Sequence, residues 1–307
     1  MAIACAAIAL LAVLLAWPVP VVLARARWTT RSPAVALALW QAIALGGGLA
    51  MIGSLLGYGL LPTGLGLVEA VPVFAGALFA GPLPAAVGVT QGLALSAAVI
   101  LGIHLLLNLA RTAAVTERQR RRHRELVGLL SSPIPSQPGA RMLDHPAPVA
   151  YCLPGVHTIT VLSQGLIELL ADDELEAVLA HERTHLRQQH HLVLLAFKAW
   201  NAALPWFPIA NRAERSVAEL VEMLADDEAR RTVSGETLAR AIKRVGSAWE
   251  SPDASGTGYV PDAVAVQRRA ERLEPGNRPL SPAARSAVLT GSAALALAPA
   301  IFMLGLL

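Results

Sequence analysis

Four long apolar runs dominate the pattern of hydrophobic and polar positions along the chain. They cover residues 1–24, 34–58, 85–110 and 286–307, and none of them contains Asp, Glu, Lys or Arg. A helix needs about 20 mostly apolar residues to cross the hydrocarbon core of a bilayer. The pattern therefore predicts four transmembrane helices, three before and one after a long polar segment. No Lys or Arg precedes the first run, unlike in a signal peptide, so we interpret it as a retained span.

The polar segment, residues 111–285, has the mixed patterns of an α+β domain. Residues 111–130 predict a helical extension of the third span, and the five prolines within 131–148 predict a loop. Loose alternation and β-branched residues over 149–162 predict a β-hairpin. A short helix is expected over 163–170.

A long helix is predicted to begin at Asp173, because Asp173 and Glu176 have the spacing of a capping box. No Gly or Pro follows until Pro205, so we expect this helix to be unbroken up to that residue. The rest of the segment predicts helices over 210–232, 235–250 and 261–273, with a flexible linker over 251–258.

Charge is distributed as unevenly as hydropathy. Charged residues make up 15% of the chain and hydrophobic residues 54%, which is more apolar than an ordinary soluble domain. Residues 1–110 contain only three arginines and Glu69 as charged residues, and the other 43 lie in 111–285. This distribution excludes a purely soluble enzyme, a secreted disulfide scaffold and a disordered chain.

Positive charge also predicts the orientation, because Lys and Arg collect on the cytoplasmic side of a membrane. Arginines follow the first span at 25–31 and the third span at 111–124, whereas the loop 59–84 carries only Glu69. We therefore expect a multi-pass protein of the cell membrane, with both termini outside and the 111–285 domain cytoplasmic. The short apolar segment 69–81 is a candidate re-entrant or interfacial piece. Juxtamembrane arginines account for the pI near 9.2, so the lipid bilayer is an expected partner and nucleic acid is not.

Two pairs of side chains stand out from this background. Cys5 and Cys152 are far apart in the sequence, so no disulfide framework is expected, in keeping with a reducing cytosol. His104 and Asn108 lie one helical turn apart in the third span, and we interpret them as polar contacts between helices rather than as transport residues.

The predicted long helix contains the sequence HERTH at residues 181–185. His181 and His185 are four residues apart, so both imidazoles lie on one face of the helix and can reach a single Zn²⁺. Glu182 lies next to the first histidine, where it can take a proton from a water that attacks a peptide carbonyl. HExxH should arise by chance in roughly one chain in a hundred of this length, so further residues have to support the site.

A catalytic zinc site of this kind needs a third protein ligand and an open fourth position. Glu222 is our candidate, because Asp226 follows it by one turn on the same helical face. The Asp226 carboxylate can hydrogen-bond a ligand imidazole and fix its tautomer. Glu219 is the competing candidate, but Met223, not an acid, follows it by one turn.

His191 offers a different third ligand, ten residues after His181, as in HExxHxxGxxH sites. The glycine position of that pattern holds Gln188, and on one unbroken helix the two histidines would lie about 15 Å apart. Residues 186–195 contain no turn residue. We therefore predict that His190 and His191 lie at the solvent or membrane end of the helix.

Together these segments resemble the BlaR/MecR-type membrane zinc metallopeptidases and, more distantly, the HtpX/Ste24-type membrane proteases. The similar part covers about residues 150–232. It includes YCLPG at 151–155, SQGL at 163–166, DELEAVLAHERTH at 173–185 and EMLAD at 222–226. Four spans, with the peptidase between the third and the fourth, also resemble the BlaR/MecR plan.

The resemblance implies a mainly α membrane protein with about four transmembrane helices and a zincin-like α+β cytosolic peptidase domain. It implies one Zn²⁺ per chain on His181, His185 and Glu222, with Glu182 as the catalytic base. It further implies that the substrate backbone pairs with an edge strand, here residues 159–162. The antibiotic sensors of that family carry a penicillin-binding domain after the fourth span, which is not expected in a chain that stops at Leu307.

The expected function is that of an integral-membrane, zinc-dependent endopeptidase that cleaves a cytosolic or membrane protein. By family analogy, the substrate is a BlaI-like transcriptional repressor, cleaved in signal transduction. Two alternatives stay open: HtpX-like quality control of membrane proteins, and a non-catalytic membrane signalling protein with a structural zinc site. The intact HERTH sequence favours an enzyme over the last alternative.

Overall fold

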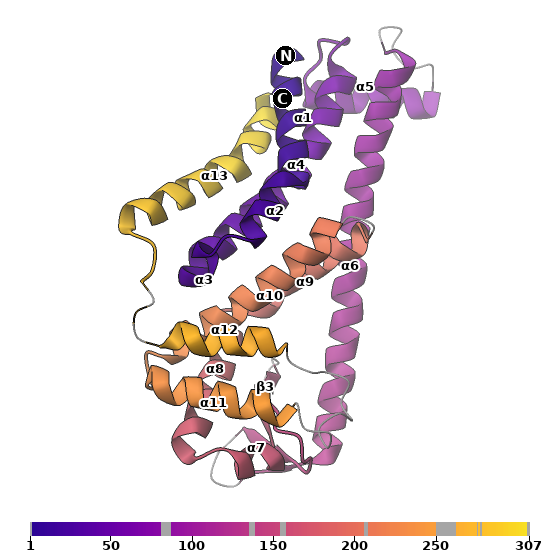
Figure 1. Cartoon of the computed structure of the whole chain (residues 1–307). Coiled ribbons are helices and arrows are strands. Elements are labelled where there is room, and N and C mark those ends of the chain that lie inside the picture. The colour runs from indigo at the N-terminus through magenta and orange to yellow at the C-terminus, as the bar shows by residue number, and fades with distance from the viewer. Residues whose placement is uncertain are drawn as a thin grey trace. The chain divides into compact units, whose positions relative to one another are not determined.

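A computed structural model describes residues 2–80, 87–134, 139–153, 158–205, 208–249, 262–274, 276 and 278–305 (Figure 1). The chain divides into two compact units. One unit, called the membrane unit below, comprises residues 1–110, 199–216 and 280–307. The other, the polar unit, comprises residues 111–198 and 217–279. The linker predicted over 251–258 lies outside the described residues.

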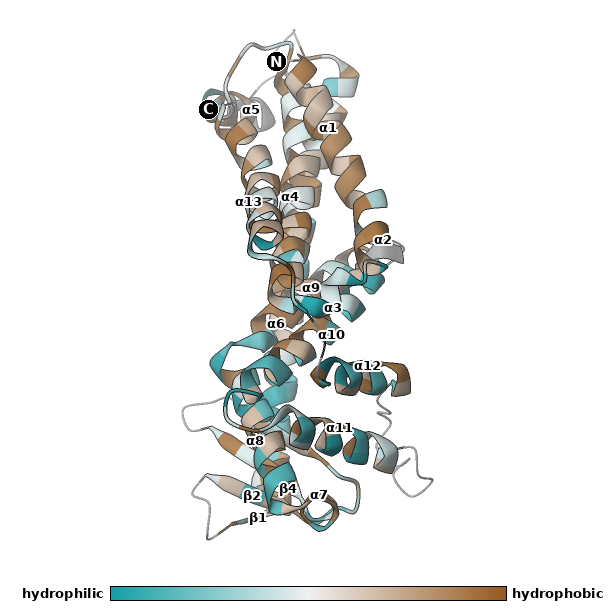
Figure 2. Cartoon of the chain, turned by 60° about the vertical axis from the view of Figure 1, so that its left-hand side comes forward, coloured by the Kyte–Doolittle hydropathy of each residue, from teal (hydrophilic) through white to brown (hydrophobic). Residues whose placement is uncertain are grey.

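Within the described residues, four segments are helical, long and apolar enough to cross a membrane, as the hydropathy pattern predicted. They are Ala2–Ala24, Pro33–Leu60 (α4), Val89–Leu130 (α6) and Pro282–Gly305 (α13). Hydrophobic residues run along α1, α4 and α13 in Figure 2. The first segment consists of α1 (Ala2–Ala16) and α2 (Pro18–Ala24). They meet at Trp17, because Pro18 has no N–H to continue the hydrogen bonds of α1. The single turn α3 (Trp28–Arg31) lies between the first and second segments, and the short helix α5 (Leu67–Ala80) lies between the second and third.

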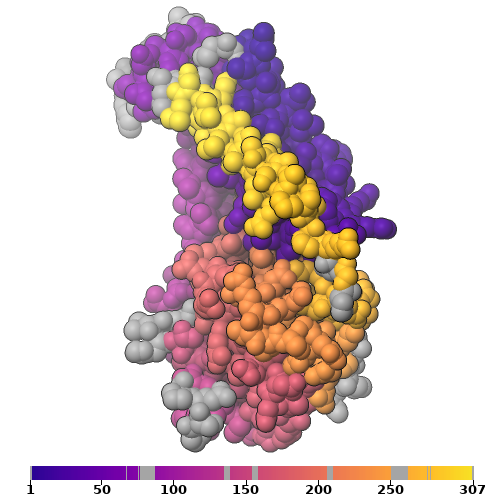
Figure 3. All heavy atoms as spheres, turned by 90° about the vertical axis from the view of Figure 1, so that its left-hand side faces the viewer, coloured from indigo at the N-terminus to yellow at the C-terminus, as the bar shows by residue number. Residues whose placement is uncertain are grey.

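Glycines allow close packing of helices within the membrane unit. Helix α4 packs against α1 and α13, and α13 lies along the indigo helices in Figure 3. A Cβ atom at Gly46 would lie 2.4 Å from the backbone oxygen of Leu295, and one at Gly57 would lie 2.8 Å from the sulfur of Cys5. Small residues at such crossings let helix backbones approach. Cys5 is therefore a packing residue, and both it and Cys152 are free thiols.

The membrane unit also includes the end of α9 (His190–Ala203) and the start of α10 (Pro208–Ala229). His104 Nε2 lies 2.9 Å from the carbonyl oxygen of Ala203, so His104 makes a polar contact between helices, as predicted. Asn108 instead hydrogen-bonds within its own helix, to His104.

The polar unit contains a four-stranded mixed sheet with the strand order β1-β2-β4-β3. The strands are β1 (Ser131–Pro133), β2 (Ala140–Leu143), β3 (Ala150–Leu153) and β4 (Ile159–Ser163). Strands β3 and β4 form the predicted antiparallel hairpin. The prediction of a loop throughout 131–148 was wrong, because β1 and β2 pair there. Strands this short, next to prolines, leave no alternation that the sequence pattern could reveal.

The sheet order also corrects the predicted substrate strand. Strand β4, which covers 159–162, lies between β2 and β3 and is hydrogen-bonded on both sides. A strand whose two edges are both paired has no free backbone groups for a substrate, so this prediction was wrong. The neighbouring strand β3 is an edge of the sheet.

The other helices of the polar unit are α7 (Gln164–Leu169), α8 (Asp172–Arg187), α11 (Gly235–Trp249) and α12 (Ala263–Leu273). The side chain of Ser163 accepts a hydrogen bond from the backbone N–H of Leu166 and so caps α7. Leu162 of the sheet and Leu166 share a buried cluster with Leu170 and Leu179. This cluster holds α8 against the hairpin, which fixes the position of the HERTH residues.

The N-terminus of α8 differs from the predicted capping box. The helix begins at Asp172, so Glu174, not Glu176, occupies the third position. Glu174 accepts a hydrogen bond from the backbone N–H of Ala171 at 3.1 Å and another from Arg244 at 2.6 Å. Several acids follow one another here, so spacing alone did not identify the capping one.

The predicted long helix is in fact two helices, α8 and α9. Helix α8 ends at Arg187 and α9 begins at His190. Between them, Gln189 has a φ of 50°, in the left-handed region that non-glycine residues adopt uncommonly. The prediction of an unbroken helix up to Pro205 was wrong, because a glutamine makes the break without Gly or Pro.

Candidate metal centre

Three candidate ligands meet in the polar unit, two from α8 and one from α10. The Nε2 atoms of His181 and His185 are 3.1 Å apart, and each lies 3.3 Å from an oxygen of Glu222. A tetrahedral ion with bonds of about 2.0–2.1 Å separates its ligand atoms by about 3.3 Å. The spacing of these three donor groups therefore fits one Zn²⁺.

The charges of the cluster also favour a cation. Burial acts to lower the pKa of His181, but contacts with Asp226 and Glu222 raise it to about 9. Burial acts to raise the pKa of Glu222, but His181 and Arg269 lower it to about 2. Burial lowers the pKa of His185 to about 4. The carboxylates therefore draw positive charge to the centre of the cluster, and a divalent cation supplies such a charge.

The competing third ligands lie elsewhere. Glu219 pairs with Arg268 at 3.2 Å. His191 is half-buried, and the group of candidate metal ligands found among the described residues does not contain it. The structure thus brings Glu222, and neither competitor, to the two histidines of HERTH.

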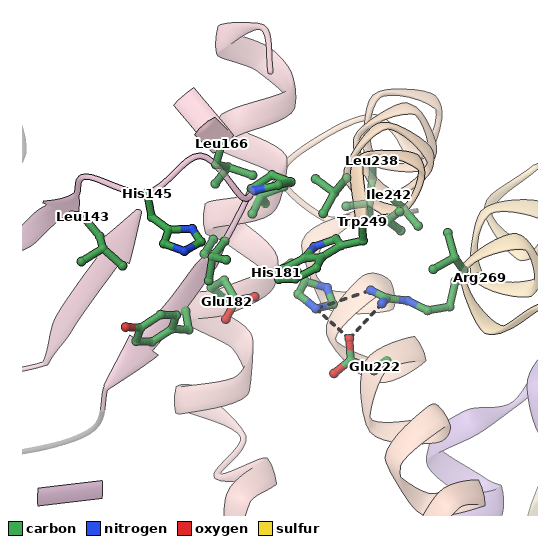
Figure 4. A pocket seen from close by; sticks show the side chains of 18 of the residues that line it. Leu143, His145, Leu166, His181, Glu182, Glu222, Leu238, Ile242, Trp249 and Arg269 are labelled. Atoms are coloured by element: carbon green, nitrogen blue, oxygen red, sulfur yellow. Dashed lines mark hydrogen bonds and ion pairs between the residues drawn. The ribbon is translucent and has the colours of Figure 1, made fainter. Parts of the chain in front are cut away.

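Asp226 and Arg269 contact the cluster from its outer side. Asp226 is completely buried, and its Oδ1 lies 2.9 Å from Nδ1 of His181, the ring nitrogen that faces away from His185. Arg269 of α12 donates to both oxygens of Asp226, at 2.9 and 2.8 Å. A third guanidinium nitrogen lies 2.9 Å from Glu222 (Figure 4). Burial acts to raise the pKa of Asp226, but Arg269 and His181 hold it well below its usual range.

Sequence reasoning missed Arg269. It lies more than 40 residues after Glu222, next to Arg268 and near Arg272 in the same helix, so the sequence gives no spacing that singles it out. The only available signal was general: a buried Asp226 needs a partner for its charge. The structure shows which of the neighbouring arginines provides it.

Glu182 lies beside the cluster, on the wall of the pocket drawn in Figure 4. Burial raises the pKa of Glu182 to about 7; His181 lowers it and Glu222 raises it further. A general base works best when its pKa is near the operating pH. A carboxyl group with a pKa near 7 can both accept and donate a proton at neutral pH.

The prediction that His190 lies at the solvent or membrane end of the helix was wrong, because His190 lies against His185. It is 3% exposed, and its Nδ1 lies 3.0 Å from Nδ1 of His185. Its Nε2 lies 2.9 Å from the side-chain oxygen of Gln188. The break at Gln189, with a φ of 50°, lies between the two helices and accompanies this placement.

A cavity of about 510 Å³ opens beside the candidate ligands. Apolar side chains form most of its wall, among them Leu166, Leu238, Ile242 and Trp249, which surround the pocket in Figure 4. The edge strand β3 contributes Ala150 and Tyr151. Ligand pockets of about 300–1,000 Å³ are typical of binding sites, so the cavity has room for several side chains of a bound segment.

The comparisons agree with this arrangement. Residues 113–230 match the family model described as peptidase family M48. The region that matches this family begins after the apolar part of the third candidate span and ends before the fourth, in a mostly helical chain with a small mixed sheet. No curated protein and no solved structure matches the chain.

The match supports a membrane metalloprotease. It begins at residue 113, inside α6, and so includes the helical extension of the third span. The resemblance to the BlaR/MecR-type peptidases covered only about residues 150–232. It ends at residue 230, before Arg269. The choice between a BlaR/MecR-type and an HtpX/Ste24-type protein stays a prediction.

Proposed function

We propose that the chain is an integral-membrane zinc metalloendopeptidase. In this proposal, His181, His185 and Glu222 hold one Zn²⁺, Asp226 orients His181, and Glu182 is the general base. The observation that carries it is the set of three donor groups at the spacing of a tetrahedral ion. A half-buried carboxylate beside them and the candidate spans found among the described residues give further support.

The side chains of the site have separable tasks in peptide hydrolysis. A bound zinc ion would act as a Lewis acid that polarises the peptide carbonyl and acidifies a water molecule. Glu182 takes a proton from the attacking water and gives it to the departing amide nitrogen. Asp226 accepts the Nδ1 proton of His181, which leaves Nε2 free to ligate. Arg269 contacts the carboxylates of both Asp226 and Glu222 and so fixes their positions relative to each other.

The cleft supports an extended peptide as the substrate. Strand β3 is an edge strand, and two of its residues line the cavity next to Glu182. A substrate strand that adds to such an edge forms main-chain hydrogen bonds, while its alternate side chains enter pockets. The apolar wall favours a substrate with a large hydrophobic residue close to the cleaved bond.

We further propose that cleavage serves signal transduction, with a BlaI-like repressor as the substrate and the domain facing the cytosol. The proposal follows the resemblance of the four-span plan to that family and the arginines that flank the first and third spans. HtpX-like quality control is the alternative use of the same chemistry. A non-catalytic role for the metal site is the alternative of a different class.

The test uses the full chain purified in detergent. It is incubated with a BlaI-like winged-helix repressor, and separately with an unfolded protein such as casein, with and without a zinc chelator. Chelator-sensitive cleavage of the repressor at one bond supports the signalling role. Cleavage of casein alone supports quality control. If neither is cleaved while cells still signal, the site is not catalytic.

Metal content distinguishes the proposed ligand from its competitor. We expect the purified chain to contain one zinc ion, Glu222→Ala to lose it, and Glu219→Ala to keep it, because Glu219 contacts Arg268 instead. Elemental analysis after gel filtration measures this. If Glu222→Ala keeps full zinc while Glu219→Ala or His191→Ala loses it, the ligand assignment is wrong.

Labelling of single cysteines tests the orientation. In a chain with Cys5 and Cys152 replaced by serine, Ser247→Cys lies on an exposed part of α11 and Pro62→Cys in the loop after α4. A membrane-impermeant maleimide added to intact cells should label Pro62→Cys and leave Ser247→Cys unlabelled until the cells are lysed. The opposite pattern would place the domain outside the cell and exclude a cytosolic substrate.

A further inference from the structure

The two candidate histidine ligands have different groups behind them. His181 has the carboxylate of Asp226 at its outer ring nitrogen. His185 has another imidazole in the equivalent place: Nδ1 of His190 lies 3.0 Å from Nδ1 of His185. The two rings are nearly perpendicular, at 82°, with centroids 4.9 Å apart. This edge-on arrangement allows one nitrogen to donate a proton to the other.

The contacts define a single consistent set of tautomers. Nε2 of His185 faces the cluster, next to His181 and Glu222. When that nitrogen ligates a metal, it is unprotonated, so the hydrogen of the neutral ring is on Nδ1. Nδ1 of His185 then donates to Nδ1 of His190. His190 must carry its own hydrogen on Nε2, where the side-chain oxygen of Gln188 accepts it at 2.9 Å.

The local backbone is built around this chain of hydrogen bonds. His190 is 3% exposed, and a buried imidazole is costly unless both nitrogens are satisfied. Here both are, one by His185 and one by Gln188. The left-handed conformation of Gln189, at a φ of 50°, brings His190 back toward α8. A non-glycine residue in that conformation costs about 1 kcal/mol or more, so the surrounding contacts have to offset it.

We propose that His190 is a positioning residue for the metal site, acting through His185. It accepts the Nδ1 proton of His185, fixes the tautomer with a free Nε2, and sets the plane of the ring; Gln188 fixes the tautomer of His190 in turn. The proposal rests on the zinc site of the proposed function. In this proposal His190 accepts the Nδ1 proton of His185, just as Asp226 accepts the Nδ1 proton of His181.

The test compares substitutions at two neighbouring histidines. His190→Leu removes the acceptor and keeps an apolar side chain of similar reach. His190→Asn puts the amide oxygen at the position of Nδ1, so an acceptor for His185 is restored. His191→Leu is the matched control, because His191 does not belong to the group of candidate metal ligands found among the described residues. Zinc affinity of the full-length chain in detergent is measured by competition with a chromophoric chelator.

Groups that orient metal ligands typically contribute about 10–100-fold to metal affinity. We expect His190→Leu to weaken zinc binding by that factor, His190→Asn to recover most of it, and His191→Leu to bind within about twofold of the unchanged protein. The absorption spectrum of the Co²⁺ form should change in His190→Leu only. Wild-type affinity in His190→Leu would overturn the proposal. Equal losses in the Leu and Asn variants would do so too, because packing alone would then explain them.

These measurements separate the positioning role from the proposed function. If zinc binding responds to His190 as expected but no protein is cleaved, the peptidase proposal fails and the positioning role stands. If the chain cleaves its substrate and His190→Leu binds zinc normally, the positioning role fails and the peptidase stands. A chain that binds no zinc at all would overturn both.

Discussion

Replacing Glu182 by glutamine should leave zinc binding intact and lower the rate of peptide cleavage by about 10²–10⁴-fold. Glutamine has nearly the same size and can still hydrogen-bond, but it cannot accept a proton from the attacking water. Glu182 lies beside the candidate ligands and is not one of them, so the metal should stay. Zinc content and cleavage of the substrate are measured on both proteins side by side.

The matched control for this substitution is Glu176→Gln. Glu176 belongs to the same helix but is exposed, so its loss should leave the cleavage rate unchanged. If Glu182→Gln cleaves at the wild-type rate, Glu182 is not the base. If it loses zinc as well as activity, its role is structural rather than in proton transfer.

The parts of the fold that the sequence predicted are those with long-range periodicity or fixed spacing. Four uncharged runs of more than 20 residues specify spanning helices without any knowledge of their neighbours. The HERTH sequence places two imidazoles on one face of α8 because a helix repeats every 3.6 residues. Glu222 was found because Asp226 follows it by one turn, and the structure places both against His181.

The parts that were missed depend on contacts between residues far apart in the sequence or on an unusual backbone conformation. The break between α8 and α9 occurs at Gln189, a residue type that ordinarily continues a helix. Because this break was not predicted, the position of His190 beside His185 was not predicted either. Arg269 was missed because only the fold brings α12 to α10. Strand β4 was predicted to be an edge strand because β1 and β2 are too short to give a recognisable alternation in the sequence.

Each candidate histidine ligand thus has a different side chain at its outer ring nitrogen: Asp226 at His181 and His190 at His185. These two side chains differ in charge. His190 is a neutral acceptor near a turn, whereas Asp226 is a buried anion paired with the partly buried cation of Arg269. A neutral hydrogen-bond acceptor such as His190 affects mainly the ligand that it orients. A buried ion pair also affects the stability of the unit, because removing one member leaves the other charge without compensation.

Asp226→Asn is therefore expected to destabilise the zinc-free chain by about 3–5 kcal/mol and to weaken zinc binding by about 10–100-fold. The asparagine amide cannot accept from both Arg269 and His181 without turning a donor toward one of them. Arg269 would stay buried against α10 with only Glu222 to offset its charge. Unfolding of the metal-free protein by urea in detergent and chelator competition measure the two effects separately.

Glu228→Gln is the control on the same helix. Glu228 pairs with Arg187 and Arg231, two exposed arginines, and a pair of this kind contributes about 0–1 kcal/mol. The double variant Asp226→Asn with Arg269→Met should lose less stability than the sum of the two single variants, because it removes both buried charges together. If Asp226→Asn unfolds at the same urea concentration as Glu228→Gln and binds zinc normally, the buried pair supports neither the fold nor the metal site. If the single losses simply add, Asp226 and Arg269 act independently, and the cost of Asp226→Asn comes from its contact with His181 alone.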